Sequence, residues 1–71
     1  MIVIKTKALK YYMREAGYSS QVAFAVDLEM TKDRLNKIIN NKADGFHTKT
    51  LNKMCGLLGV QPGEILEFQP D

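Results

Sequence analysis

The apolar positions change helical face near the middle of the chain. Phe24 and Leu28 lie four positions apart and share one face of a helix, whereas Leu35 and Ile39 share a face of the next one. No single helix keeps all four residues on one side. The spacing therefore predicts two short helices that meet at a tight turn within residues 21–39.

Three residues in and beside this turn favour a sharp corner. Met30 supplies an apolar plug between the two helices. Thr31 can cap the second helix by accepting a hydrogen bond from one of its free N–H groups. Ala25 is small where the first helix passes close to the second. We therefore expect the second helix to occupy residues 31–40.

The N-terminal part of the chain predicts a strand and a helix. Residues 1–6, MIVIKT, form a β-branched run that favours a strand. Because so short a strand is unstable alone, it needs a partner. We expect it to pair with the tail at residues 66–69 or with a second chain across a dimer interface. The helix covers residues 7–16, with Leu9, Met13 and Ala16 on its inner face.

The C-terminal part predicts one longer helix and a short one. The longer helix begins at His47 or Thr48, after a polar loop whose Phe46 is expected to anchor it to the core. Its apolar stripe consists of Leu51, Met54, Cys55 and Leu58. Pro62 starts the short helical turn, because proline is favoured at a helix start. Ile65, Leu66 and Phe68 are then expected to close the core.

The order and spacing of these elements resemble the Cro-type (Xre-like, lambda-repressor-like) helix-turn-helix DNA-binding domains. The corner positions that carry the resemblance are Gln21, Phe24, Ala25, Met30, Leu35 and Ile38. Residues 9–17, 50–55 and 57–66 resemble the family's first helix, its fourth helix and its C-terminal segment. The resemblance covers nearly the whole chain. It implies an all-α, compact domain of four to five helices over residues 1–71, to which the N-terminal strand is added.

Two features depart from the family's pattern. Glu29 stands where the family usually has glycine, which adopts a left-handed backbone most cheaply, so we expect a slightly different turn. Val22, Ala23 and Val26 occupy positions that the family commonly keeps polar. The first helix of the corner is therefore apolar nearly all round, and we expect it to meet another surface.

The charges are unevenly distributed along a chain whose formal net charge is only +2. Residues 32–53 hold six basic residues and two acidic ones, and they coincide with the proposed second helix and the loop after it. A basic segment there suits a phosphate backbone. The same charges also fit an ordinary solvated surface.

Composition excludes several other classes of protein. One cysteine and one histidine, without a metal-ligand pair or a phosphate-cradling glycine loop, argue against an enzyme, a metal site or a cofactor. No apolar run approaches the roughly 20 residues that span a bilayer. A single cysteine cannot form an internal disulfide, which suits a reducing interior. We therefore expect a cytoplasmic protein.

The sequence and the resemblance together predict a sequence-specific regulator that binds double-stranded DNA as a homodimer, with the helix over residues 31–40 in the major groove. The expected base contacts are Lys32, Asp33, Asn36 and Lys37, whose side chains suit base edges. The expected phosphate contacts are Gln21, Thr31, Arg34, Asn40 and Lys42. The alternative is an antirepressor or other interaction module on the same fold, which would bind another regulatory protein through its exposed valines.

Overall fold

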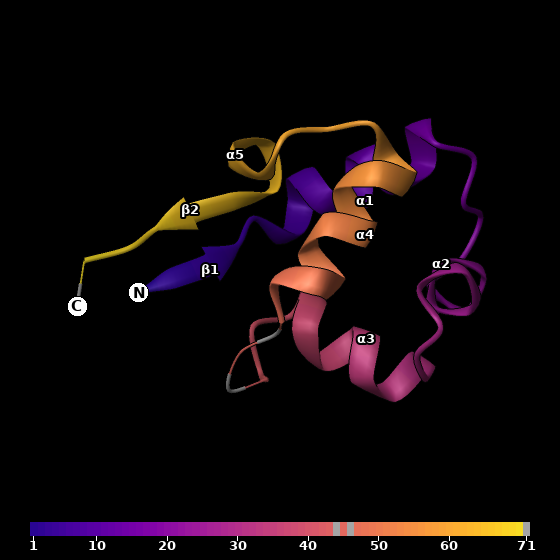
Figure 1. Cartoon of the computed structure of the whole chain (residues 1–71), viewed down its shortest axis with the longest axis horizontal. Helices are drawn as coiled ribbons and strands as arrows, with labels where there is room; N and C mark the ends of the chain where they lie inside the picture. Colours follow the sequence, from indigo (N-terminus) through magenta and orange to yellow (C-terminus); the bar gives the residue numbers. More distant parts are fainter. Residues whose placement is uncertain (44, 46, 71) are drawn as a thin grey trace.

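The chain folds into five helices and a two-stranded sheet, seen in a computed structural model that describes residues 1–43, 45 and 47–70 (Figure 1). In chain order the elements are β1 (Ile2–Ile4), α1 (Thr6–Glu15), α2 (Gln21–Leu28), α3 (Lys32–Ile39), α4 (Thr48–Leu58), α5 (Pro62–Ile65) and β2 (Leu66–Phe68). The predicted helices are therefore confirmed to within one residue at most ends. The predicted anchor Phe46 lies outside the described residues.

The helices pack around a single cluster of buried apolar side chains. Phe24 and Ala25 from α2 meet Leu35 and Ile38 from α3, so the two helices of the predicted corner share one core. The remaining buried members of the cluster are Ile4, Leu9, Met13, Leu28, Ile39, Met54 and Ile65. No buried side-chain nitrogen or oxygen lacks a hydrogen-bond partner among the described residues. No polar or charged residue is buried in the described part of the chain, so the core is apolar, as the sequence pattern requires.

Four helices end in the same way, on a residue with a left-handed backbone. These residues are Gly17 (φ 92°), Glu29 (φ 59°), Asn41 (φ 60°) and Gly59 (φ 67°). In each case the N–H of the following residue donates to the carbonyl five positions earlier, at 2.8–3.1 Å. This closure satisfies carbonyls that a helix end would otherwise leave unpaired.

Glu29 forms the corner of the helix-turn-helix without the usual glycine. Its backbone has φ 59° and ψ 42°, and the N–H of Met30 donates to the carbonyl of Ala25 at 3.0 Å. The turn therefore keeps the left-handed conformation, whereas we expected its geometry to change. Outside the core, the Glu29 carboxylate lies 3.1 Å from the ammonium of Lys53 on α4.

We expect Glu29→Gly to raise the free energy of unfolding by about 0.5–1 kcal/mol, measured by urea denaturation. Glycine removes a left-handed strain of about 1 kcal/mol, while the lost ion pair with exposed Lys53 contributes little. The control is Glu29→Ala, which loses the same ion pair but keeps the strain. If Glu29→Gly were less stable than Glu29→Ala, backbone strain at this corner would have to be rejected.

The two ends of the chain pair with each other. The N-terminal strand therefore has the C-terminal tail as its partner, the first of the two alternatives expected from the sequence. β1 and β2 are antiparallel, with Ile2 opposite Phe68 and Ile4 opposite Leu66. On its other edge β1 is held by Asn41, which follows α3. The Asn41 Oδ1 accepts from the Ile4 N–H at 2.7 Å, and its Nδ2 donates to the Ile4 carbonyl at 3.0 Å. Asn41 thus takes the place of a third strand at this position.

Two residues expected in the core lie outside it. Phe68 is 69% exposed, because Ile65 already closes the core and β2 then leads away from the helices (Figure 1). Ala16 is exposed because α1 ends at Glu15 and leaves it at the helix terminus. The prediction that both residues pack inside was therefore wrong.

Candidate nucleic-acid interface

α3 is held firmly from one side and is open on the other. Its start is capped as predicted, since the Arg34 N–H donates to the Thr31 Oγ1 at 3.2 Å. Leu35, Ile38 and Ile39 are buried and fix the helix to the core. A helix anchored in this way can present its opposite face to a ligand without changing shape.

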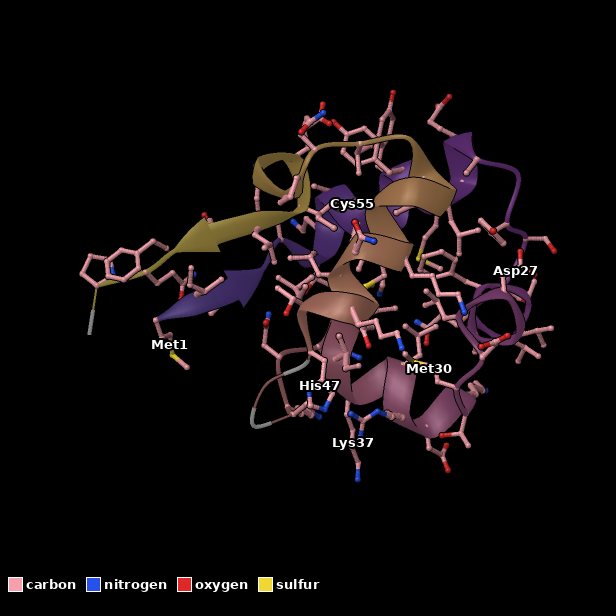
Figure 2. All side chains as sticks on the ribbon, viewed as in Figure 1. Met1, Asp27, Met30, Lys37, His47 and Cys55 are labelled. Carbon is pink, nitrogen blue, oxygen red and sulfur yellow. The ribbon has the colours of Figure 1, made fainter. Side chains whose placement is uncertain are left out.

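The open face of α3 carries all the predicted α3 contact residues. Lys32, Asp33, Arg34, Asn36 and Lys37, together with Asn40 at the helix end, are exposed. Figure 2 shows the Lys37 side chain extending away from the protein. Asp33 lies in the first turn of the helix, where the helix dipole favours a negative charge. This face of α3 therefore presents cations, amides and one carboxylate together, so that a single ligand can contact all of them.

Two asparagines on this face are bonded to each other. The Asn40 Nδ2 donates to the Asn36 carbonyl at 2.9 Å and to the Asn36 Oδ1 at 3.0 Å. The Asn36 amide is thereby oriented, and its own Nδ2 and the second lone pair of its Oδ1 remain free for a ligand. Sequence reasoning assigned Asn40 to phosphate and missed this contact, although an i, i+4 pair of amides on one helix face is a visible signal.

The start of α2 lies beside a small basic hollow. Ser20 caps α2 by accepting from the Ala23 N–H at 3.3 Å, and Gln21 follows it as a half-buried residue. Lys10 and Arg14 of α1 line the same hollow as Gln21. These two cations were not among the predicted contacts. Together with the N–H groups at the start of α2, they favour an anionic ligand here.

The start of α4 forms a second basic region, separate from the one beside the start of α2. His47 occupies the N-cap position of α4, but its side chain makes no capping bond. A groove there is lined by Leu28, Glu29 and residues 47–50, together with Lys53. Lys53 forms an ion pair with Glu29, and Lys49 is the other lysine that lines this groove. Lys42, the remaining predicted phosphate contact, is exposed in the loop between α3 and α4.

The other polar groups near the corner have structural partners. Tyr18 donates its phenol O–H to the Asp27 Oδ2 at 2.7 Å, and this hydrogen bond raises the pKa of Tyr18 above its usual value, aided by desolvation and the Asp27 charge. The Tyr18 ring also meets the Phe24 ring edge to face, at 4.8 Å between centroids. Asp27 is therefore engaged in holding α2 to the loop before it.

Cys55 has the properties of a packing residue. It is half-buried beside the core, and desolvation raises the pKa of its thiol, with the negative charge of Glu64 acting in the same direction. A raised pKa lowers the thiolate fraction near neutral pH and hence the reactivity. Within the described ranges, no group of His, Cys, Asp and Glu side chains is arranged to hold a metal ion. None of the described helices is long and apolar enough to cross a membrane.

Together, α2, the left-handed corner at Glu29 and the exposed face of α3 define a helix-turn-helix unit. The chain belongs to the Cro/C1-type helix-turn-helix DNA-binding domain family, whose model matches residues 8–71. No curated protein and no solved structure matches the chain significantly. The resemblance inferred from the sequence is thereby confirmed, and the class of protein is that of a DNA-binding domain.

Proposed function

We propose that this protein is a sequence-specific transcriptional regulator, acting as a Cro-like repressor, which places α3 in the major groove of double-stranded DNA. The observation that carries the proposal is the shape of α3. Three buried residues fix it to the core, and its opposite face is entirely polar and exposed. A helix has the right diameter for the major groove, where the base edges differ most.

Four residues of α3 are proposed to read bases. Asn36 can bond an adenine twice, and its amide is already oriented by Asn40. Lys32 and Lys37 can donate to guanine acceptors, and Asp33 can accept from a cytosine amine. Each of these groups is exposed in the protein alone. None has to leave a buried site before it can meet a base.

The residues around α3 are proposed to hold the phosphate backbone on both sides of the groove. Gln21 stands at the start of α2 beside Lys10 and Arg14, and Lys49 lies at the start of α4. The remaining phosphate contacts are Thr31, Arg34, Asn40 and Lys42. Backbone contacts on both flanks fix the register of a recognition helix, which then allows its side chains to select a sequence.

A homodimer is part of this proposal. A single domain of this size buries too little DNA surface for high specificity, so two copies on a near-palindromic site are expected. Their half-sites would lie about one helical turn apart. Regulation would then follow from occupancy of the site and from the concentration of the protein.

Titration of ¹⁵N-labelled protein with a short duplex tests where DNA lies. The expected amide shift changes are largest in residues 31–42 and at the starts of α2 and α4. The amides of β2 should move least, because β2 lies on the side of β1 opposite to Asn41, away from α3 (Figure 1). Changes that centre on the sheet instead would place the DNA elsewhere and contradict the proposal.

A second candidate function rests on the outer face of α2. Val22 is 50% exposed and Val26 is 68% exposed, and both lie on a helix adjacent to α3. Exposed apolar side chains suit a protein partner better than they suit DNA. The same fold could thus act as an antirepressor that binds another regulator.

Replacing Val22 and Val26 together by serine separates the two functions. Under the DNA-binding proposal, the double variant should bind a random duplex within about twofold of the parent protein, because neither valine is a phosphate contact. Fluorescence anisotropy measures this ratio. An unchanged affinity, with no loss of a protein partner in a pull-down, would remove the support for the interaction module.

A further inference from the structure

Most carbonyl groups at the end of α3 are bonded by the chain that directly follows them. The donors are the N–H groups of Asn40, Asn41 and Lys42, at 2.8–3.2 Å. The carbonyl of Ile39, the last residue of α3, has a different partner. It accepts a hydrogen bond from the hydroxyl of Thr6 at 2.7 Å. The end of α3 is therefore completed by a side chain from the other end of the sequence.

Thr6 is the first residue of α1, and its hydroxyl donates to α3 across 33 positions of sequence. A threonine at a helix start more often bonds to the backbone of its own first turn. Lys5, the N-cap residue of α1, makes no side-chain capping bond. Ile39 is fully buried, so its carbonyl would lose its partner if Thr6 lost its hydroxyl. The contact therefore contributes more to α3 than to α1.

The segment before α1 holds the end of α3 a second time. The Asn41 side chain pairs with both backbone groups of Ile4. The Ile4 side chain is buried in the same apolar cluster as Ile38 and Ile39. Residues 4–6 therefore contact both the last turn of α3 and the first residue of the loop that follows Asn40.

We infer that Thr6 is a positioning residue for DNA recognition, which fixes the end of α3 through the Ile39 carbonyl. Asn40 follows Ile39 directly, and its Nδ2 donates to the Asn36 carbonyl and to the Asn36 Oδ1. Thr6 thus acts on the base-reading amide of Asn36 through Asn40, without touching DNA. This inference rests on the proposed function and deepens it, since it names a residue that sets the specificity of α3.

Loss of the Thr6 bond is expected to affect base contacts more than phosphate contacts. A helix end that is already fixed meets DNA without first being ordered, and ordering a group on binding lowers the affinity. A bidentate contact between an amide and a base needs a fixed geometry. A lysine such as Lys42 reaches a phosphate on a long flexible chain and tolerates a small displacement. The ratio of operator affinity to random-duplex affinity therefore reports the role of Thr6.

NMR relaxation of ¹⁵N-labelled protein tests the contact without DNA. Thr6→Val keeps the shape of the side chain but removes the O–H. The backbone order parameters of Asn40 and Lys42 should fall from about 0.85, the value of a rigid backbone, toward about 0.7. Thr6→Ser keeps the hydroxyl and should keep the values of the parent protein. Order parameters that do not change in Thr6→Val would overturn the inference.

Fluorescence anisotropy with a selected operator and a random duplex tests the effect on recognition. Thr6→Val should weaken operator binding by about threefold to tenfold, which corresponds to the net contribution of one hydrogen bond. Its affinity for the random duplex should change by less than about twofold, and Thr6→Ser should restore the ratio of the parent protein. Equal losses on both duplexes, or an unchanged operator affinity, would show that Thr6 does not position α3 for base reading.

Cys55→Ala is the control for a general loss of stability. It removes packing beside the core, and Figure 2 shows Cys55 far from Lys37 of α3. Its ratio of operator to random-duplex affinity should stay within about twofold of the parent value. A ratio that fell as much in Cys55→Ala as in Thr6→Val would attribute the loss to stability and overturn the inference.

The two measurements separate this inference from the proposed function. A parent protein that binds no duplex would overturn the proposed function, whereas the order parameters would still decide whether Thr6 fixes the end of α3. A parent protein that selects an operator, together with a Thr6→Val variant that selects it equally well, would overturn the inference and leave the proposed function standing.

Discussion

Asn41→Ala is expected to lower the free energy of unfolding by about 2–4 kcal/mol. The substitution leaves the N–H and carbonyl of buried Ile4 without partners, at about 1–3 kcal/mol for unpaired buried groups. It also forces alanine into a left-handed conformation (φ 60°), which costs about 1 kcal/mol more. A domain of this size has only about 3–5 kcal/mol of net stability. Urea denaturation should therefore show a protein that is close to unfolded in buffer.

Two controls separate the causes of this loss. Asn41→Gly keeps the left-handed conformation but loses both hydrogen bonds, so it should be more stable than Asn41→Ala by about 1 kcal/mol. Asn40→Ala removes a neighbouring exposed amide and should change stability by no more than about 0.5 kcal/mol. If Asn41→Ala were as stable as Asn40→Ala, Asn41 would have no role in holding β1.

Asn36→Ala is expected to weaken binding to a preferred operator by about tenfold to a hundredfold. A bidentate contact between an amide and adenine supplies about 1–3 kcal/mol of discrimination. Binding to a random duplex should change by less than about twofold, because it depends on phosphate contacts. An operator selected from a random pool and measured by anisotropy beside the random duplex gives both numbers. Equal losses on both would assign Asn36 to the backbone or to folding.

Asn40→Ala serves as the companion variant to Asn36→Ala. It removes the donor that orients the Asn36 amide but leaves that amide in place. Its loss on the operator should therefore be smaller than that of Asn36→Ala. A loss on random duplex of the same size as on the operator would instead support the phosphate role that the sequence suggested.

The elements that depend on local spacing could be predicted from the sequence. The buried positions Phe24 and Leu35 follow from three- and four-residue intervals, and the capping role of Thr31 follows from its residue type and place. The family resemblance likewise rested on spacing, and the match over residues 8–71 confirms it. The proposed base and phosphate contacts also derive from this pattern, and they remain predictions.

The features that depend on distant contacts could not be predicted in this way. Asn41 bonds to Ile4 across 37 positions of sequence, and nothing in the loop composition indicates that partner. Phe68 looked like a core residue because it is large and apolar. Whether it is buried depends on how far the sheet extends beyond Ile65, which is a property of the packed fold. Glu29 shows that residue type alone can also mislead. Because it is not glycine, we expected a different turn, yet its backbone is left-handed in the folded protein.

Binding of the parent protein to a labelled random duplex, followed by fluorescence anisotropy across a salt series, tests the central claim most directly. The five cationic residues among the proposed phosphate contacts are Lys10, Arg14, Arg34, Lys42 and Lys49. They predict that the logarithm of the association constant falls with the logarithm of salt concentration, with a slope of about −4 to −5. A steep slope of this size would support a recognition helix held between two phosphate-binding flanks. Absence of binding at low salt, or an affinity that does not change with salt, would contradict the account and point to a protein partner.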